Sequence, residues 1–488
     1  MTDGMSNQAY YDTIIVGAGI SGICAAYHHQ KQCPEKTFII LEGRGTLGGT
    51  WDLFKYPGIR SDSDMFTFGF PFSPWKSPKT IADGKSIMEY LHKTAKDFGI
   101  DEKIRYHQKV VDASWNDGEK QWSLTIAPHG DAGGYILKCK FLFMCSGYYN
   151  YEHGYLPKFE GYEDFRGRIV HPQFWDTELD HAGKRIIVIG SGATAVTLVP
   201  TLAKTAEKVY MLQRTPTYIS SLPSVDKFAV KIQKIFPERM AHGIMRWRNI
   251  SISLLLYKLA RRYPEKIGNY LRAQAKKRIG PTYDEKDFTP PYQPWDQRVC
   301  FVPGGDLFKA IRSGKAEIVT DHIERFTERG ILLKSGKELE ADVIVTATGL
   351  DLRLLGGIQL NINNKPLDPG NHYVYRGAMI SGVPNFAFAI GYINASWTMK
   401  VDLTSRFVVK VLNHMSKNGY TVVTPTMAED RVTPEPLLDF NSGYVMRAEK
   451  LLPKQGNKHP WKIYQNYFRD FISLNLETVR DKYLVYKK

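Results

Sequence analysis

Residues 13–22 read TIIVGAGISG, and a second stretch of similar design, RIIVIGSGATA, occupies residues 185–195. In each stretch, an apolar run that suits a buried strand leads into closely spaced glycines where a helix is expected to begin. Such glycines let the backbone approach a pyrophosphate, which then receives N–H groups and the positive dipole end of the helix. Two such turns predict an α/β protein with two Rossmann-like dinucleotide-binding domains. The candidate contact residues are Gly17, Gly19, Ser21 and Gly22 in the first turn, and Gly190, Ser191, Gly192, Ala193, Thr194 and Ala195 in the second.

The end of the next expected strand distinguishes the two dinucleotides. After the first turn, the run TFIILE ends in Glu42, and a carboxylate there accepts hydrogen bonds from a ribose whose hydroxyls are free. After the second turn, the run VYMLQRT places Arg214 and Thr215 at the corresponding position. An arginine and a hydroxyl are suited to binding a 2′-phosphate. We therefore predict FAD in the first site and NADPH in the second.

The composition is that of a folded protein with more than one domain. Hydrophobic residues make up 43% and charged residues 24% of the 488 positions, and this length exceeds what one core normally serves. No apolar run approaches the roughly 20 residues of a membrane-spanning helix, and the first dozen residues lack the features of a signal peptide. The five cysteines are scattered without a CxxC pair, which argues against disulfides, a zinc site and a redox dithiol. We expect a cytoplasmic protein that binds no metal.

Much of the net charge of +15 is concentrated in one segment. Residues 226–278 contain fourteen Lys and Arg residues against three Asp and Glu residues, and the segment reads as amphipathic helices. The interpretation that we favour is an inserted helical subdomain with a solvated basic face. Peripheral contact with an anionic membrane is the alternative. No nucleic-acid-recognition fold accompanies the segment, so we expect no nucleic acid to bind.

The order of motifs predicts a discontinuous arrangement of domains. The buried-strand pattern that ends in glycine at residues 141–147 recurs at 343–349, which indicates that the chain returns to the first domain. We expect a first part of the FAD domain at 1–152, a first part of the NADP domain at 153–223 and a basic helical insertion at 224–280. The second part of the NADP domain is expected at 281–338 and the remainder of the FAD domain at 339–488.

Two further stretches resemble one family. Residues 48–62, GGTWDLFKYPGIRSD, fit the pattern of class B flavoprotein monooxygenases. Residues 165–176, FRGRIVHPQFWD, fit the Baeyer–Villiger signature FxGxxxHxxxW, whose characteristic residues here are Phe165, Gly167, His171 and Trp175. Related N- and S-oxygenating flavin monooxygenases usually carry Tyr or Phe in place of this tryptophan. The runs SDSDMFTFGF, PWDQR and LPKQG are similar to those of the ethionamide-activating monooxygenases within the Baeyer–Villiger branch.

This resemblance implies roles for particular residues. Arg298 resembles the arginine that lies over the flavin and stabilises negative charge on the reacting oxygen, and Asp62 resembles its carboxylate partner. The signature residues resemble a hinge between the two dinucleotide units. Gln297 stands where many family members carry a lysine that helps to bind the 2′-phosphate, and Trp397 and Met399 are pocket or core candidates. The flavin is expected to contact Gly49, Thr50, Trp51, Asp52 and Leu53, the adenine of FAD to contact the backbone of Val110, and the nicotinamide end to lie beside Arg60 and Ser61.

The resemblance implies an FAD-dependent, NADPH-consuming Baeyer–Villiger monooxygenase. Such an enzyme uses O₂ and a flavin C4a-peroxide to insert one oxygen atom beside a carbonyl, which turns ketones into esters or lactones. Small hydrophobic ketones are the expected substrates, with sulfides and thioamides as further ones. One alternative is an N- or S-oxygenating flavin-containing monooxygenase. Another is a membrane-surface or interaction protein that binds flavin only for structure.

Overall fold

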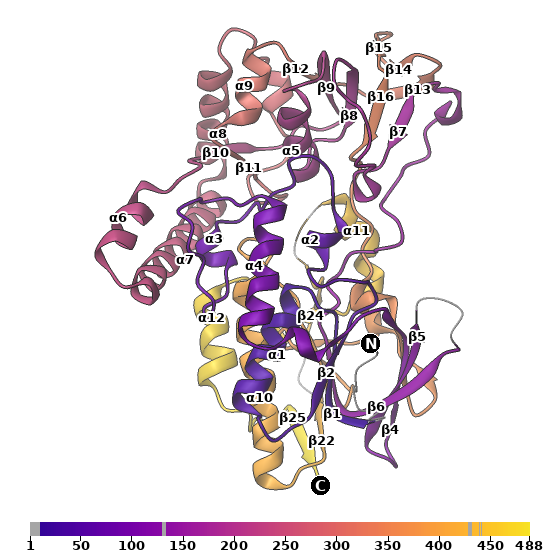
Figure 1. The fold of residues 1–488 in the computed structure, drawn as a ribbon, viewed down its shortest axis with the longest axis vertical. Coiled ribbons are helices and arrows are strands. Elements are labelled where there is room, and N and C mark those ends of the chain that lie inside the picture. The colour runs from indigo at the N-terminus through magenta and orange to yellow at the C-terminus, as the bar shows by residue number, and fades with distance from the viewer. Residues whose placement is uncertain (1–9, 129–132, 428–431, 439, 441) are drawn as a thin grey trace.

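The computed structural model has two lobes, each built around its own sheet: a mixed sheet in one lobe and a parallel sheet in the other (Figure 1). It describes residues 10–128, 133–427, 432–438, 440 and 442–488. The lobe drawn lower in Figure 1 contains the N-terminal glycine turn, and the upper lobe contains the second one. The predicted α/β class with two Rossmann-like units is confirmed.

The sheet of the lower lobe forms around β1, which pairs in parallel with β2 on one side and β6 on the other. Ile14 and Ile15 of β1 are fully buried on opposite faces, as expected for a parallel strand covered on both sides. The strand order is β18 (Lys365–Pro366), β17 (Gln359–Ile362), β4 (Gln108–Asn116), β5 (Gln121–Pro128), β6 (Tyr135–Met144), β1 (Tyr10–Val16), β2 (Phe38–Leu41) and β3 (Ile104–Arg105), with β21 (Phe386–Phe388) also beside β6.

The sheet of the upper lobe is parallel throughout the described residues. Its order is β12 (Ala316–Thr320), β9 (Lys208–Gln213), β8 (Arg185–Ile189), β16 (Val343–Thr346) and β7 (Arg168–Val170). The return to the FAD domain was expected at residue 339, but β16 pairs with β8 and β7 and therefore belongs to the upper lobe. The apolar run of β16 suits either sheet, so its pattern alone does not assign it. The chain returns to the first lobe beyond Gly349, where β17 pairs with β4.

Helices cover both sheets. In the lower lobe α1 packs against α10, which is followed by Gly419 in a left-handed conformation (φ 68°), as is common for a glycine after a helix. Within the first turn of α10, Lys400 is buried and its Nζ lies 2.9 Å from Asp470 Oδ2. The helices outside the insertion are α1 (Ile20–Gln32), α2 (Thr50–Leu53), α3 (Met65–Phe68), α4 (Gly84–Asp97), α5 (Ala193–Leu202), α9 (Asp306–Arg312), α10 (Trp397–Asn418), α11 (Gly443–Ala448) and α12 (Tyr467–Phe471).

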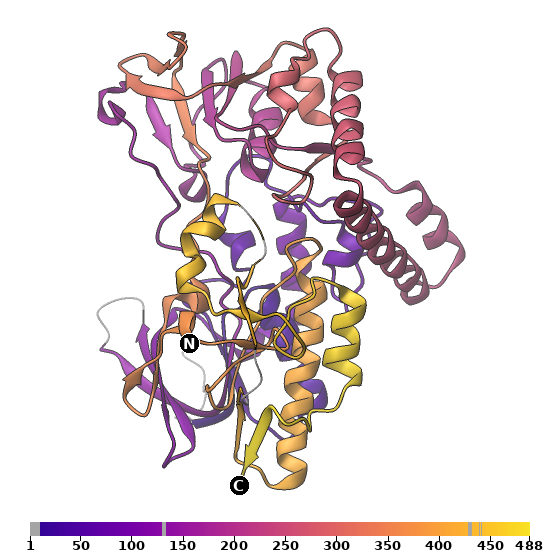
Figure 2. The ribbon, with the colours of Figure 1, turned by 180° about the vertical axis from the view of Figure 1, so that it is seen from behind.

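The basic segment is helical, as expected. It consists of α6 (Lys227–Ile235), α7 (Glu238–Arg262) and α8 (Pro264–Ile279). Helix α8 lies against the upper lobe (Figures 1 and 2). Helix α6 and the start of α7 form a hairpin that projects from the side of the molecule. Asp226 caps α6 by accepting hydrogen bonds from the N–H groups of Phe228 and Ala229.

Short strand pairs complete the structure. They are β10 (Ile219–Leu222) with β11 (Cys300–Pro303), the group β13 (Ile323–Thr327), β14 (Gly330–Leu333) and β15 (Glu338–Glu340), β19 (Val374–Tyr375) with β20 (Met379–Ile380), β22 (Val422–Pro425) with β25 (Leu484–Lys487), and β23 (Pro434–Glu435) with β24 (Gln455–Gly456). The pair β10–β11 matters for the site, because β11 begins two residues after Arg298.

Candidate functional site

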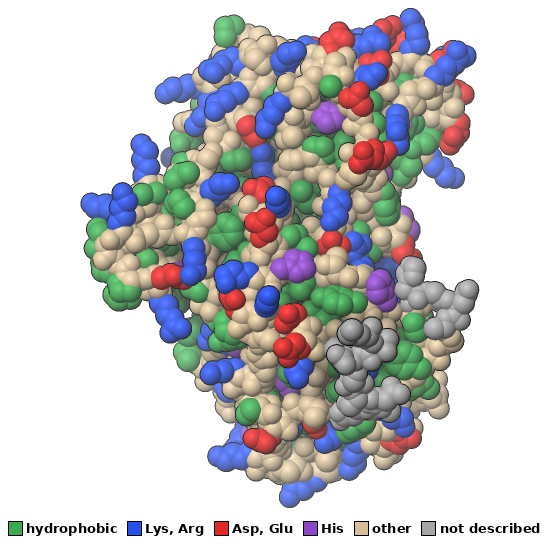
Figure 3. Space-filling view, in the orientation of Figure 1, with side chains coloured by type: hydrophobic (Ala, Val, Ile, Leu, Met, Phe, Trp, Pro, Cys, Tyr) green, Lys and Arg blue, Asp and Glu red, His purple; other side chains and the backbone are tan. Residues whose placement is uncertain are grey.

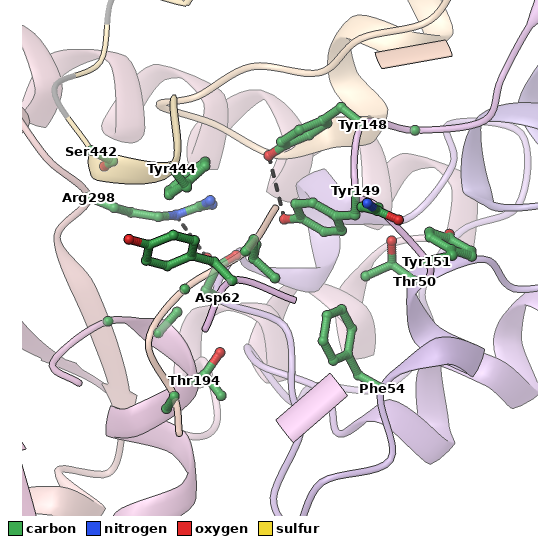
Figure 4. Close-up of a pocket in the computed structure, with 18 of the residues that line it drawn as sticks. Thr50, Phe54, Asp62, Tyr148, Tyr149, Tyr151, Thr194, Arg298, Ser442 and Tyr444 are labelled. Carbon is green, nitrogen blue, oxygen red and sulfur yellow. Dashed lines mark hydrogen bonds and ion pairs between the residues drawn. The ribbon is translucent and has the colours of Figure 1, made fainter. Parts of the chain in front are cut away.

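One large cavity of about 1490 Å³ lies between the two lobes and reaches both glycine turns. This volume exceeds that of an ordinary small-ligand pocket, and it suits two dinucleotides side by side. The carboxyl ends of the parallel strands β1 and β8 open into it, which is where ligands bind in open α/β sheets. Figure 4 shows part of its lining, with side chains from both lobes and from the C-terminal region.

The first turn has a backbone that only glycine allows. Gly17 has φ 103°, and a Cβ atom on it would lie 2.7 Å from the carbonyl oxygen of Cys145. A Cβ on Gly22 would lie 1.8 Å from the carbonyl oxygen of Gly17, so Gly22 holds α1 against the turn rather than lining the cavity. Gly19 immediately precedes α1 and lines the cavity, as does Ser21. The helix start is therefore open to an anionic group.

Glu42 follows β2 and binds the glycine turn from the other side. Its Oε2 accepts a hydrogen bond from the N–H of Ala18 at 2.8 Å, and its Oε1 accepts one from the N–H of Arg44 at 2.9 Å. Burial raises the pKa of this carboxyl above its ordinary value. Each oxygen retains a second lone pair, so Glu42 can shape the turn and still accept a hydrogen bond from a ribose hydroxyl.

The second turn repeats this design in the upper lobe. Gly190 has φ 134°, and a Cβ on it would lie 2.3 Å from the carbonyl oxygen of Ala347. Ser191 Oγ donates a hydrogen bond to the carbonyl oxygen of Thr215 at 2.8 Å, which fixes the loop after β9 beside the turn. Arg214 is exposed and lines the cavity with Thr215. The other lining residues of this turn are Gly192, Ala193 and Thr194, whereas Ala195 is buried in the core of the lobe.

Arg298 and Asp62 meet at the centre of the cavity. Arg298 comes from the loop before β11, Asp62 from the loop after α2, and Arg298 Nε lies 2.9 Å from Asp62 Oδ2 (Figure 4). Each side chain is about one third exposed, 34% and 35%, into the cavity. Burial alone lowers the pKa of Arg298, but the Asp62 carboxylate and neighbouring tyrosines outweigh it and raise the pKa above its usual range. The guanidinium therefore carries a permanent positive charge.

Tyrosines surround this ion pair, and the sequence analysis did not identify them. Tyr148 and Tyr149 directly follow the turn after β6, and Tyr444 lies on α11. The Tyr148 and Tyr149 hydroxyls are 3.5 Å apart. Burial raises the pKa of all three phenols, so they remain neutral hydrogen-bonding groups. Tyr148 and Tyr149 could have been identified from the sequence, because they follow the carboxyl end of a buried strand.

Trp397 connects the tyrosines to the first glycine turn. Its ring stacks on Tyr148 with centroids 5.1 Å apart, and its Nε1 donates a hydrogen bond to Ser21 Oγ at 2.9 Å. Trp397 lines the cavity, whereas Met399 is buried in the core. Trp397 is therefore a pocket residue and Met399 a core residue.

Only some of the residues from Gly49 to Leu53 line the cavity. Gly49, Thr50 and Trp51 line the cavity, but Asp52 and Leu53 do not. Asp52 instead forms ion pairs with Arg44 and with Lys55, the latter at 2.9 Å. The remaining candidates that line the cavity are Arg60, Ser61, Val110 and Gln297. Arg60 forms an ion pair with Asp306, and the Ser61 hydroxyl donates a hydrogen bond to the carbonyl oxygen of Ser63.

The four signature residues lie away from the cavity lining. Gly167 is required because a Cβ on it would lie 2.4 Å from the Phe165 ring. Trp175 packs against the core of the upper lobe. His171 Nδ1 accepts a hydrogen bond from the N–H of Gln173 at 3.2 Å, and burial lowers the pKa of His171. This neutral ring is not placed to act on a ligand in the cavity.

A buried group elsewhere combines the side chains of a metal site. Cys24, His28 and Asp402 offer ligand atoms within 4.8 Å of one another. His28 Nε2 already lies 2.8 Å from Asp402 Oδ1, and Arg406 Nε lies 3.0 Å from Asp402 Oδ2. The carboxylate is thus satisfied by the His28 contact, which joins α1 to α10, and by an ion pair within α10.

Comparisons with known proteins place the chain in a family. The model of the flavin-binding monooxygenase-like family matches residues 13–422. The chain is 51% identical over 481 residues to the FAD-containing monooxygenase EthA of Mycolicibacterium smegmatis, covering 98% of this chain and 97% of that protein. It is 46% identical over 465 residues to the probable FAD-binding monooxygenase AlmA of Acinetobacter baylyi, covering 95% and 93%.

Solved structures show the same fold. An oxidised steroid monooxygenase bound to NADP superposes with a TM-score of 0.75 at 20% identity, covering 98% of this chain and 100% of that one. OTEMO in complex with FAD and NADP (form 4) gives 0.71 at 21% identity, covering 85% and 88%. The resemblance drawn from the sequence is therefore confirmed, and the chain belongs to the flavin-binding monooxygenase-like family.

Proposed function

We propose that this protein is an FAD-dependent, NADPH-consuming Baeyer–Villiger monooxygenase that inserts one oxygen atom from O₂ into hydrophobic ketones. The observation that carries the proposal is the Arg298–Asp62 ion pair, which stands in one cavity with both glycine turns. The overall reaction would convert ketone, O₂, NADPH and a proton into ester or lactone, NADP⁺ and water. Sulfides and thioamides are further proposed substrates.

The residues of the first turn fit FAD. The open start of α1 beyond Gly19 would receive the pyrophosphate, and Glu42 has lone pairs left for the ribose. Thr50 and Trp51 would contact the flavin, and Val110 would lie near the adenine. Relatives about 50% identical are named FAD-containing monooxygenases, which supports the assignment.

The second turn fits NADPH. Arg214 would form charge-assisted hydrogen bonds with the 2′-phosphate, helped by the Thr215 hydroxyl. Gly190, Ser191 and Gly192 would hold the pyrophosphate, and Arg60 and Ser61 would lie at the nicotinamide end. Because Gln297 is uncharged, the preference for NADPH over NADH rests mainly on Arg214.

The flavin, once reduced by NADPH, supplies the activated oxygen, and the residues of this chain control the charge that develops. The Arg298 guanidinium would stabilise the negative oxygen that forms when the carbonyl is attacked, as preorganised donors do in a dry site. Asp62 would hold this guanidinium in place through its contact with Nε. Tyr148, Tyr149 and Tyr444 would exclude water and offer aromatic surface to an apolar ketone.

Phe165, Gly167, His171 and Trp175 would act at a distance, as a hinge between the lobes. Gln173, next to His171 in space, donates through Nε2 to the carbonyl oxygen of Asn150 at 2.8 Å and so links the two lobes. If the upper lobe moves when NADPH binds, the Gln173–Asn150 hydrogen bond would transmit that movement to the lower lobe.

The test is product analysis with ¹⁸O₂, NADPH and a medium-chain methyl ketone. We expect an ester that carries one heavy oxygen from the purified yellow protein. NADPH consumption that yields only hydrogen peroxide with ketones, together with oxygenation of a sulfide or an amine, would instead assign the chain to the N- or S-oxygenating type.

A further inference from the structure

The hairpin formed by α6 and the start of α7 carries an unusual surface at its outermost part, residues 227–240, here called the hairpin tip. Phe228, Ile235 and Met240 are 41%, 59% and 54% exposed there. Phe228, Ile232 and Ile235 share one face of α6, on which Ile232 is buried and Phe228 and Ile235 are exposed. The Arg248 guanidinium of α7 lies 4.8 Å from the centre of the Phe228 ring and covers part of it. These apolar side chains lie on a segment that projects from the body (Figures 1 and 2).

Positive charge surrounds these apolar side chains. Lys227, Lys231, Lys234 and Arg239 are exposed, and among the described residues none of them lies within ion-pair distance of a carboxylate. Figure 3 shows hydrophobic and basic side chains intermixed over this projection at the left edge of the molecule.

Glu238 of the tip and Asp226, which directly precedes the tip, are already paired. Glu238 Oε2 lies 3.0 Å from Lys76 Nζ, and Asp226 Oδ2 lies 2.6 Å from Arg248 Nη1 while also capping α6. The tip therefore presents unneutralised positive charge together with exposed apolar side chains.

We propose that the hairpin tip docks on an anionic phospholipid surface, with Phe228, Ile235 and Met240 entering the interface and the four basic residues contacting the headgroups. This combination of apolar and basic side chains is that of an interfacial helix. No helix among the described residues is long and apolar enough to cross a bilayer, so contact would be peripheral. A nucleic-acid backbone would satisfy the charges but would leave the apolar side chains without a partner.

The experiment is cosedimentation of the full-length, flavin-loaded protein with vesicles of phosphatidylcholine alone or with 30% phosphatidylglycerol. Binding needs no turnover, so the result does not depend on the proposed reaction. We expect binding only to the anionic vesicles, and weakening as salt rises. A charge near an anionic surface changes the partition coefficient by about fivefold.

Two variants of the tip and two matched controls decide the outcome. Replacing Lys227, Lys231, Lys234 and Arg239 by Gln should lower the partition coefficient at least tenfold. The control replaces the exposed Lys204, Lys315, Lys334 and Lys417 by Gln, which gives the same change in net charge, and should lower it less than threefold.

The apolar variant, Phe228→Ser with Ile235→Ser and Met240→Ser, should also lower binding at least tenfold. Its control replaces Ile136, Leu451 and Val485 by Ser, which are exposed elsewhere, and should bind as the natural protein does. None of the altered residues lines the cavity, so NADPH oxidation with a soluble substrate should be unchanged in every variant.

Equal losses in the charge variant and its control would overturn the proposal, since nonspecific attraction of the whole basic protein would then explain binding. Full binding by the apolar variant would also overturn it, because attraction between the basic side chains and the anionic vesicles would then suffice without entry of the apolar side chains. Absence of binding by the natural protein to anionic vesicles at low salt would reject a lipid surface outright.

Discussion

Arg298 Nε lies 2.9 Å from Asp62 Oδ2, and both residues line the cavity between the lobes. This contact holds the guanidinium charge beside a carboxylate within the cavity. Because each partner is about one third exposed, the pair contributes little to stability, as is general for accessible ion pairs. Its value therefore lies in the orientation of charge, and the predictions begin with these two residues.

Removing the guanidinium should abolish oxygen transfer while leaving the flavin bound. For Arg298→Ala we expect kcat for ester formation to fall by about 10²-fold or more, the cost of losing a preorganised donor. Arg298→Lys should recover only a small part, because an ammonium cannot bind Asp62 and a reacting oxygen in the same plane. The measurement is product yield per flavin. Arg353→Ala removes a guanidinium from the same cavity and is the control; an equal loss there would argue against a special role for Arg298.

Neutralising Asp62 should loosen Arg298 rather than remove it. For Asp62→Asn we expect about a tenfold fall in kcat with a larger share of NADPH consumed as hydrogen peroxide, and less than about 1 kcal/mol change in the free energy of unfolding. Oxygen uptake and peroxide assays with and without ketone separate the two routes. Unchanged coupling between NADPH oxidation and ester formation would show that the carboxylate does not position the arginine.

Arg214 should decide between the two nicotinamide dinucleotides. Loss of a charge-assisted hydrogen bond costs about 1.5–3 kcal/mol, so Arg214→Ala should raise KM for NADPH roughly 10- to 100-fold and leave KM for NADH almost unchanged. Gln297→Lys places a charge in the same cavity and should lower KM for NADPH. Steady-state kinetics with both dinucleotides is the measurement. Parallel changes in both KM values would place Arg214 away from the 2′-phosphate.

Two buried histidines should make the protein sensitive to mild acid. Burial lowers the pKa of His29 and of His242 to about 4, against about 6.5 in an unfolded chain. Between these values the unfolded state binds more protons, so the free energy of unfolding rises with pH, and stability is lost as pH falls from 6.5 towards 4. Each histidine adds a slope of up to about 1.4 kcal/mol per pH unit. Urea unfolding at pH 7 and pH 5 should show a smaller difference for His242→Leu than for the natural protein; an equal difference would contradict this origin.

The sequence predicts those parts of the site that depend on local geometry. Gly17 and Gly190 could be recognised because a strand, a turn and a helix follow one another within a dozen residues, and Glu42 because it ends the next strand. The two glycines have the positive φ values that such turns need. The side chain of Arg214 lines the cavity as expected.

Features that depend on distant partners could not be predicted in this way. Lys400 is buried within α10 because it pairs with Asp470, 70 residues further along the chain. Tyr444 approaches Arg298 only because the C-terminal region folds back over the cavity, and no local pattern signals that contact. The same holds for β16, whose apolar run gives no information on which sheet it joins.

The position of β16 has a consequence for how the protein emerges from the ribosome. This strand lies between β7 and β8, although it is made after the whole helical insertion. The first sheet likewise waits for β17 and β21, and α1 waits for α10. Neither lobe can therefore complete its sheet during early synthesis, and apolar strand edges stay uncovered until most of the chain has been translated. Such late, non-local pairing slows folding and exposes the nascent chain to aggregation, so its yield should depend on chaperones and on the rate of translation.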